Sequence, residues 1–417
     1  MTAELTIPAP RNTSAELFFK IAFAMGVLVA GLEIGYLIYS PLPYDPLGYL
    51  VGRDFVNTWL GGQLALTGDP GAYFGPEAYN GLVKERFGPS YPHHIWSYPP
   101  TFLLFTWPFA LMPYVAAYVL YSLIGLVVYL AVATEGRPRA DKILLLVFAP
   151  AVIVNLWGGQ TGFFVAALLI GGLIALERRP ILAGVLFGLL SIKPQLGLLI
   201  PVMLVLTGRW RTIAAASATI AVLVAAASLA FGPKVWVAYV NDAMPAQTAL
   251  IARDFEHFMV HMPTVFMNAK VAGASMSVAI WAQVFVSAIA VVAVIWTFWR
   301  RREPELSNML FVTATFLATP YAFNYDMVVF GWVAIKLMER SDADAWDYLL
   351  MLAVWATPFM TVPSGMAGLP VSVLPMLAFG GRLIWRIWQA EQQCGGCTKT
   401  TRPRRPPARR VRSALLG

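Results

Sequence analysis

The sequence contains unusually little charge. Only 12% of its 417 residues are Asp, Glu, Lys or Arg, whereas 58% are hydrophobic. Soluble domains carry about 25% charged residues, so this composition excludes an ordinary soluble protein. The apolar residues also recur in runs near twenty, the length that an α-helix needs to cross a bilayer. The sequence therefore predicts an all-α, polytopic integral membrane protein.

Cysteine is nearly absent, and the motifs of common cofactor sites are missing. Cys394 and Cys397 form a single Cys-x-x-Cys without a second cysteine or histidine pair, which is a weak metal signal. No phosphate-binding glycine loop, nucleotide fingerprint, Gly-x-Ser-x-Gly or His-Glu-x-x-His sequence occurs. We therefore expect no metal and no other cofactor.

The net charge of +8 is concentrated at one end of the chain. Seven basic residues and no acidic residue lie between Lys399 and Arg412, which leaves the rest of the chain near neutrality. This charge distribution argues against a nucleic-acid-binding protein. The segment 392–417 is rich in Pro and Arg, so we expect a disordered cytoplasmic tail that can contact anionic lipid.

The apolar runs predict about twelve membrane crossings within a single domain over residues 1–391. The first run lacks a signal-peptide cleavage pattern and should be retained. Basic residues cluster near 137–142, 178–179, 209–211, 300–302, 336–340 and in the tail. The positive-inside rule then places these clusters and both termini in the cytoplasm. The expected crossings lie near residues 17–39, 98–133, 143–156, 161–176, 181–191, 195–207, 212–231, 276–299, 306–319, 326–338, 346–362 and 370–388.

The same topology places five polar connections on the external face. They are the long loop 41–97 and the segments 158–160, 193–195, 232–265 and 320–326. An active site on that face has no access to cytoplasmic nucleotides, so any donor must be carried by the membrane. A sugar attached to a lipid phosphate meets this requirement.

Asp54 is the first candidate for a general base. It precedes a rough helical stripe of apolar residues (Phe55, Trp59, Leu60, Leu64 and Leu66), which predicts a short amphipathic helix on the bilayer surface. A second amphipathic stretch runs from Glu77 to Phe87. The alternative is structural, because an Asp in the first turn of a helix is favoured by the helix dipole.

Lys193 is the most unusual cation of the sequence. It lies between two apolar runs that are each too short to cross the membrane, and Pro194 follows it. A lysine at such a break is costly unless it is paired, and a donor phosphate would be a natural partner. Two alternatives remain open: the side chain extends to the interface, or it pairs with a structural carboxylate such as Asp326.

Further polar residues lie in the expected external connections. Gln160 either caps a helix or reads a hydroxyl group. His257 and His261 share one helix face, a spacing that can bind metal, but no third ligand is evident. The remaining candidates for contact with a substrate are His94 and Tyr98 in the first loop and Asn324 and Tyr325 near residue 325.

Four segments together carry a family resemblance. Asp54 stands with Trp59, Leu66, Gly68, Asp69 and Tyr73; Ser97-Tyr98-Pro99-Pro100 precedes an apolar run; Gly159-Gln160 precedes another; and Ala183-Gly184-x3-Gly188 is followed by Lys193-Pro194 and Arg209-Trp210-Arg211. In this order they resemble the polytopic glycosyltransferases of the GT-C class, specifically family 87. That family includes bacterial polyprenol-phosphate-mannose-dependent alpha-mannosyltransferases.

The resemblance implies an inverting transfer of a hexose, with mannose the family-level expectation, from a polyprenyl-phosphate sugar to a lipid or glycan acceptor. It implies a multi-pass protein of the bacterial cytoplasmic (inner) membrane, with Asp54 as the general base. We expect Lys193 and Arg53 to bind the donor phosphate. We expect the substrates to contact Gln160, Tyr98, His94, His257, His261, Asn324 and Tyr325.

A transporter or flippase is the alternative, because broken helices and an intramembrane lysine also occur in such proteins. The large first external loop with Asp54, which a transporter does not need, favours the enzyme.

Overall fold

The computed structural model describes residues 13–41, 43–252, 259–299 and 303–397. These residues form helices and connections without a β-strand, which confirms the all-α prediction. The α-helices are α1 (Thr13–Ile38), α2 (Phe55–Thr67), α3 (Pro76–Phe87), α4 (Pro100–Ala110), α5 (Tyr114–Ala133), α6 (Ala140–Val147), α7 (Pro150–Gly158), α8 (Gly162–Ala175), α9 (Pro180–Leu189), α10 (Ile200–Leu206), α11 (Trp210–Phe231), α12 (Lys234–Ala238), α13 (Met244–Ala252), α14 (Val265–Val271), α15 (Met276–Trp299), α16 (Pro304–Ala318), α17 (Phe330–Glu339), α18 (Ala345–Met366) and α19 (Leu374–Cys397).

Short helical turns interrupt this series, and some of them carry residues of the site described below. They are η1 (Pro70–Tyr73), η2 (Leu190–Ile192), η3 (Pro194–Gly197), η5 (Met259–His261) and η6 (Asn324–Val329), all of the 3₁₀ type, and the π-helical turn η4 (Tyr239–Ala243). Two of them, η1 and η3, begin at a proline, which cannot continue the hydrogen-bond ladder of a preceding helix.

Five of the described helices are long and apolar enough to cross a membrane: α1, α5, α11, α15 and α18. The pair α6 and α7 would add a sixth as a broken span bent by 54°. These helices expose many aliphatic side chains, as expected for contact with lipid. The protein is thus a multi-pass membrane protein, while the count of about twelve crossings stays a prediction. Several expected crossings correspond to helices of fewer than eighteen residues, such as α8, α9 and α16.

The first loop folds into the two predicted helices, α2 and α3. The apolar side of α2 does not lie free for the bilayer, however, because Phe55, Leu60 and Leu64 are buried inside the protein. A side chain at Gly62 would come within 2.5 Å of the carbonyl oxygen of Thr106, so α2 and α4 approach each other closely. The apolar stripe therefore anchors the loop to the helical bundle.

Glycines also explain the tight contact between α9 and α11. A Cβ atom at Gly184 would lie 2.5 Å from the carbonyl oxygen of Thr212, and one at Gly188 would lie 2.6 Å from the Cβ atom of Thr219. Small residues four positions apart allow membrane helices to approach at backbone distance. The Ala-Gly-x3-Gly segment thus fixes α9, and with it the chain that leads to Lys193.

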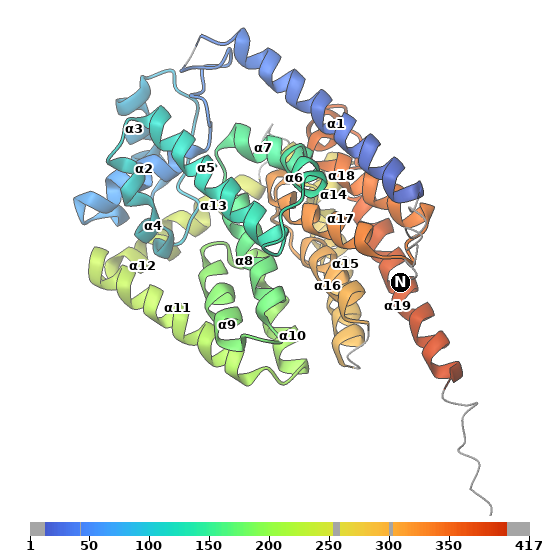
Figure 1. Ribbon diagram of the computed structural model, residues 1–417. Helices are drawn as coiled ribbons and strands as arrows, with labels where there is room; N and C mark the ends of the chain where they lie inside the picture. The colour runs from blue at the N-terminus through green and yellow to red at the C-terminus, as the bar shows by residue number, and fades with distance from the viewer. Residues whose placement is uncertain (1–12, 42, 253–258, 300–302, 398–417) are drawn as a thin grey trace, which may run out of the picture.

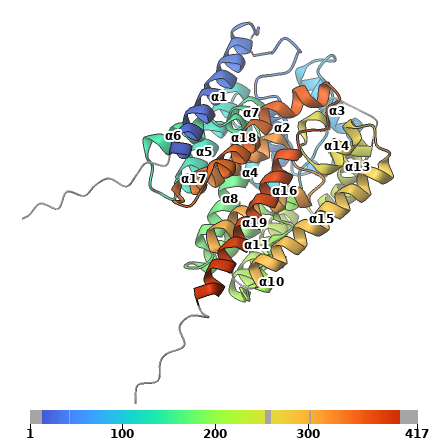
Figure 2. The ribbon, with the colours of Figure 1, turned by 90° about the vertical axis from the view of Figure 1, so that its right-hand side faces the viewer.

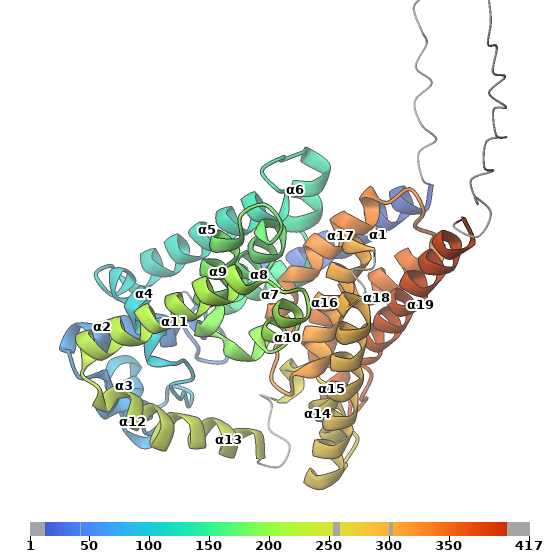
Figure 3. The same cartoon turned by 90° about the horizontal axis from the view of Figure 1, so that it is seen from below.

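Three basic residues from two of the predicted clusters, 137–142 and 336–340, form ion pairs with neighbouring parts of the chain. Lys142 lies 2.5 Å from Glu339, and Lys336 lies 2.5 Å from Glu135. Arg340 contacts Glu303 at 3.0 Å. The start of α1 and the end of α19 lie on one side of the molecule, away from α2 and α3 (Figures 1 and 3). Figure 2 shows the long helices α15 and α19 along the face turned toward the viewer.

Candidate active site

Asp54 lies at the turn that leads into α2. Gly52 (φ 77°) and Arg53 (φ 26°) precede it in left-handed conformations. Asp54 is the N-cap residue of α2, but its side chain accepts no capping hydrogen bond. The carboxylate is instead 51% exposed. The side chain thus forms no capping hydrogen bond, while its position at the start of α2 still permits the interaction with the helix dipole that is the structural alternative for this residue.

One oxygen of Asp54 accepts the last hydrogen bond of a short chain that starts at Tyr98. The hydroxyl of Tyr98 donates to Oε1 of Gln160 at 3.5 Å, and Nε2 of Gln160 donates to Oδ2 of Asp54. Because the tyrosine hydroxyl supplies a donor to Oε1, the amide nitrogen of Gln160 is left to face the carboxylate. Gln160 is buried, so this donor is held in place by the surrounding side chains.

The other oxygen of Asp54 faces His94. Nε2 of His94 lies 3.9 Å from Oδ1 of Asp54, and Nδ1 lies 3.0 Å from the carbonyl oxygen of Pro92. A carbonyl oxygen can only accept, so Nδ1 carries the proton and Nε2 is the nitrogen that faces Asp54. At 3.9 Å the imidazole faces the carboxylate without a direct hydrogen bond.

The turn that carries Gln160 fits directly against the turn that carries Asp54. Gly159 adopts a left-handed conformation (φ 56°) at the end of α7. A Cβ atom there would lie 2.6 Å from the Cβ atom of Phe55 and 2.9 Å from the carbonyl oxygen of Gly52. Glycine is required at this position by both the backbone conformation and the space.

Lys193 stands at the break between η2 and η3, as the sequence predicts, but it has a partner. Its Nζ lies 2.6 Å from Oδ1 of Asp326, and both side chains are buried. It also lies over the ring of Tyr325, 4.6 Å from the centroid. Asp326 accepts a second hydrogen bond from the backbone N–H of Phe323 at 3.0 Å. Of the alternatives left open for Lys193, the pairing with Asp326 is therefore present, whereas binding of a phosphate stays a prediction.

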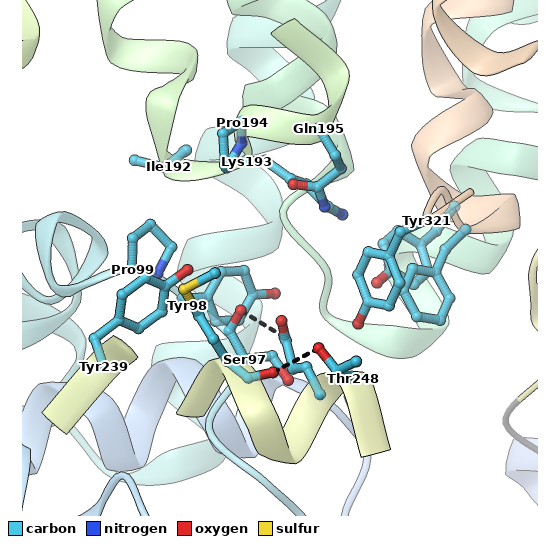
Figure 4. A pocket seen from close by; sticks show the side chains of 14 residues that line it. Ser97, Tyr98, Pro99, Ile192, Lys193, Pro194, Gln195, Tyr239, Thr248 and Tyr321 are labelled. Carbon is cyan, nitrogen blue, oxygen red and sulfur yellow. Dashed lines mark hydrogen bonds between the residues drawn. The ribbon is translucent and has the colours of Figure 1, made fainter. Parts of the chain in front are cut away.

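A cavity of about 260 Å³ opens beside Lys193 (Figure 4). Its wall comes from four of the connections that the sequence places on one face. Five of the fourteen lining residues are aromatic, Lys193 is the only charged one, and amides and hydroxyls supply the other polar side-chain atoms. The lining residues are Ser97, Tyr98, Pro99, Ile192, Lys193, Pro194, Gln195, Tyr239, Met244, Gln247, Thr248, Tyr321, Phe323 and Tyr325.

Tyr98 joins this cavity to Asp54, since it lines the wall and donates to Gln160. Burial raises the pKa of Tyr98 well above its ordinary value, and Asp54 and Asp326 are among the neighbours that add to the rise. Burial likewise raises the pKa of Tyr321, with Asp326 and Asp54 adding to it. Both hydroxyls keep their protons at neutral pH and can donate hydrogen bonds into the cavity.

Other predicted site residues lie elsewhere. Arg53 pairs with the buried Asp45 at 2.7 Å and does not line the cavity. Asn324 is buried, and its amide donates to the carbonyl oxygen of Pro358 at 2.9 Å, which is a structural contact. His261 ends η5 outside the cavity wall. His257 lies outside the described residues. Among the described residues no group of three His, Cys, Asp or Glu side chains could hold a metal ion.

Sequence reasoning missed part of the cavity wall and the partner of Arg53. Tyr239, Gln247 and Thr248 come from η4 and α13, within the expected external segment 232–265. Gln247 binds the first loop, since its Nε2 donates to the carbonyl oxygen of Ser97 at 2.8 Å. The placement of the whole segment on the site face was the available signal, but nothing in its pattern singled out these residues.

Residues 96–320, just over half of the chain, match glycosyltransferase family 87. The chain belongs to that family. No curated protein and no solved structure matches it. Membership of this family indicates that the protein is a membrane glycosyltransferase. The matched region includes Tyr98, Gln160 and Lys193, whereas Asp54 precedes it and Asp326 follows it.

Proposed function

We propose that this family 87 glycosyltransferase moves a hexose, with mannose the first candidate, from a polyprenyl-phosphate sugar to a hydroxyl group of a lipid or glycan acceptor. The transfer takes place on the external face of a bacterial cytoplasmic membrane and inverts the anomeric centre. One observation carries this proposal: an exposed carboxylate, Asp54, is tied through Gln160 and Tyr98 to an aromatic cavity that contains a buried lysine.

The chemical step needs one base and no separate acid. Asp54 takes the proton of the acceptor hydroxyl while that oxygen attacks the anomeric carbon of the donor. The bond between this carbon and the phosphate oxygen breaks, and the phosphate leaves with the bonding electrons. A phosphate leaves without protonation, whereas glycosidases need a second carboxyl group as acid. General base catalysis contributes about 10²–10⁴-fold to such a step.

Lys193 is the proposed ligand of the donor phosphate. An ammonium group has three N–H donors, and Asp326 takes one of them. The group also faces the cavity, so a phosphate there would enter beside an existing ion pair. The same cation would stabilise the charge that develops on the leaving phosphate. Arg53 is left out of this role, because it does not line the cavity.

The cavity wall supports binding of a sugar. The aromatic rings of Tyr98 and Tyr325 offer flat apolar surfaces, and the hydroxyl and amide groups offer hydrogen bonds to sugar hydroxyls. His94 does not line the cavity, so it would contact only an acceptor that is bound next to Asp54. The proposal includes neither a metal nor another cofactor, and no nucleic acid. His257, His261 and Asn324 are not needed for the reaction as proposed.

The proposed reaction on the external face requires a defined orientation of the chain in the membrane. Both termini lie in the cytoplasm, and the basic segment at the end of the chain contacts anionic lipid of the inner leaflet. The ion pairs that tie Lys142, Lys336 and Arg340 to neighbouring helices support a common face for these basic connections. A polyprenyl tail would then reach the cavity from the bilayer.

The test is product formation by purified protein in lipid vesicles. Polyprenyl-phosphate sugars are supplied together with a lipid extract of the host, and new glycosylated products are identified by mass spectrometry. Asp54→Asn should fold normally and lose at least about 10²-fold in turnover at saturating donor. Asp69→Asn is the matched control, since this exposed carboxylate of the same loop lies at the turn before η1 and should not be needed. Near-normal turnover of Asp54→Asn would refute the assignment of the base.

A further inference from the structure

The backbone before Asp54 adopts a conformation that does not suit its residue. Arg53 has a φ of 26°, and among the described non-glycine residues only Glu135 also has a positive φ. Glycine adopts this region readily, whereas a residue with a side chain is disfavoured there. Such a residue persists when its surroundings hold it, and residues of this kind cluster at functional sites. Contacts of the Arg53 side chain should therefore hold this conformation in place.

The guanidinium group of Arg53 is held on several sides. It lies 2.7 Å from Oδ2 of Asp45, whose other oxygen accepts hydrogen bonds from the backbone N–H groups of Leu47 at 2.9 Å and Tyr49 at 3.0 Å. It also lies 5.0 Å from the ring centroid of Tyr49 and 5.5 Å from that of Trp157. A planar guanidinium group can combine an ion pair with contacts to aromatic faces, which a lysine ammonium group does less well.

These contacts join two separate parts of the chain. Asp45 and Tyr49 belong to the first loop, whereas Trp157 belongs to the end of α7. Shortly after Trp157, the turn at Gly159 packs against Gly52 and Phe55. The two turns joined by Arg53 are thus the turn that carries Asp54 and the turn that carries Gln160.

We propose that Arg53 is a positioning residue that holds Asp54 against Gln160, and that it is not a ligand of the donor phosphate. This inference rests on the proposed role of Asp54 as the base. A carboxylate that takes a proton from an acceptor must be held in one geometry, and a misplacement of about 1 Å can cost about 10²-fold in rate. Arg53 provides this constraint from the residue directly before the base, without touching either substrate.

The experiment compares turnover and the donor KM of purified variants whose folding is checked by thermal unfolding. Arg53→Met should lower kcat by about 10-fold to 10²-fold and leave the donor KM within about twofold, because donor contacts remain. Asp45→Asn should act in the same direction, and Arg53→Lys should retain part of the activity. Arg53→Gly suits the backbone but removes the side chain, so it should lose as much activity as Arg53→Met.

Arg86→Met is the matched control. Arg86 also lies in the first loop and over an aromatic ring, 5.9 Å from the centroid of Trp59, but it donates to Gln63 at the surface. Its loss should leave kcat unchanged. If Arg53→Met does not fold, Arg53→Lys and Asp45→Asn carry the comparison.

Three results would overturn the inference. A raised donor KM with unchanged kcat would make Arg53 a phosphate ligand, and wild-type turnover of Arg53→Gly would show that its side chain positions nothing. A lower melting temperature with normal kcat in the folded fraction would leave Arg53 a structural role alone. The proposed function fails separately, through an active Asp54→Asn. An inactive Asp54→Asn beside normal Arg53 variants would refute only the present inference.

Discussion

The ion pair between Lys193 and Asp326 allows the structural and functional roles of Lys193 to be separated. Lys193→Met removes the charge and keeps the length of the side chain. Asp326 would then be left buried with the N–H of Phe323 as its recorded partner. Removing one member of a buried ion pair costs about 3–5 kcal/mol, because the remaining charge is uncompensated. The unfolding equilibrium should shift by roughly 10²-fold to 10⁴-fold.

The double variant Lys193→Met/Asp326→Asn removes both charges at once. Asparagine keeps an oxygen that can accept from Phe323, so this contact remains. We therefore expect the double variant to be no less stable than Lys193→Met, with a coupling energy of about 3 kcal/mol or more. Unfolding in mixed micelles can be followed by tryptophan fluorescence, since the chain contains 14 tryptophans.

The kinetics of the double variant then test the phosphate role on a protein whose fold is intact. If Lys193 binds the donor phosphate, the double variant should still show a raised donor KM and a lowered kcat, and Lys193→Arg should retain part of the activity. Initial rates measured at increasing concentrations of polyprenyl-phosphate sugar give both the donor KM and kcat. A stable double variant with normal donor dependence and turnover would refute the phosphate role and leave Lys193 as a structural partner of Asp326.

Two further predictions rest on single contacts, and a third rests on the proposed topology. Gln160→Ala should lower turnover by about 10-fold to 10²-fold, the value of a hydrogen bond to a charged group, with an unchanged donor KM in steady-state assays. Gly188→Ala should destabilise the protein by about 1–3 kcal/mol in the same unfolding assay, because a methyl group overpacks the contact with α11, whereas Gly35→Ala meets no neighbouring atom and should not destabilise. In intact cells, an impermeant thiol reagent should label a cysteine placed at Asp69 and spare the two native cysteines, and labelling of the latter would contradict the proposed topology.

The helical class and most element positions were readable from the sequence, because apolar periodicity and proline positions decide them locally. The helices α2 and α3 appear at the predicted stretches. The sequence did not indicate, however, whether the apolar side of α2 packs against lipid or against protein. An apolar stripe on a short helix fits a lipid surface as well as a protein surface. Only the packing of Trp96 against Gly61 and of α4 against Gly62 decides between them.

For the candidate site too, some features have a local sequence signature and others do not. The break at Lys193 and the turn at Gly159 have local signatures, so Lys193 and Gln160 were identified in advance. Their partners lie far away in the chain: Asp326 is 133 residues from Lys193, and Asp54 is 106 residues from Gln160. No local pattern encodes such pairings. Arg53 shows the consequence, since the sequence places it beside the expected base but gives no sign of its contacts with Asp45 and Trp157.

The two carboxylates of the site lie in contrasting environments, and this contrast supports the roles proposed for them. Asp326 is buried and bound to a cation, so its charge is fixed in place and cannot reach a substrate. Asp54 is half-exposed, and its oxygens face an amide donor and an imidazole nitrogen, neither of which is committed to neutralising it. Environments that separate two titratable groups in this way separate their roles. A base must exchange its proton in every cycle, which Asp54 can do and Asp326 cannot without breaking the pair that secures Lys193.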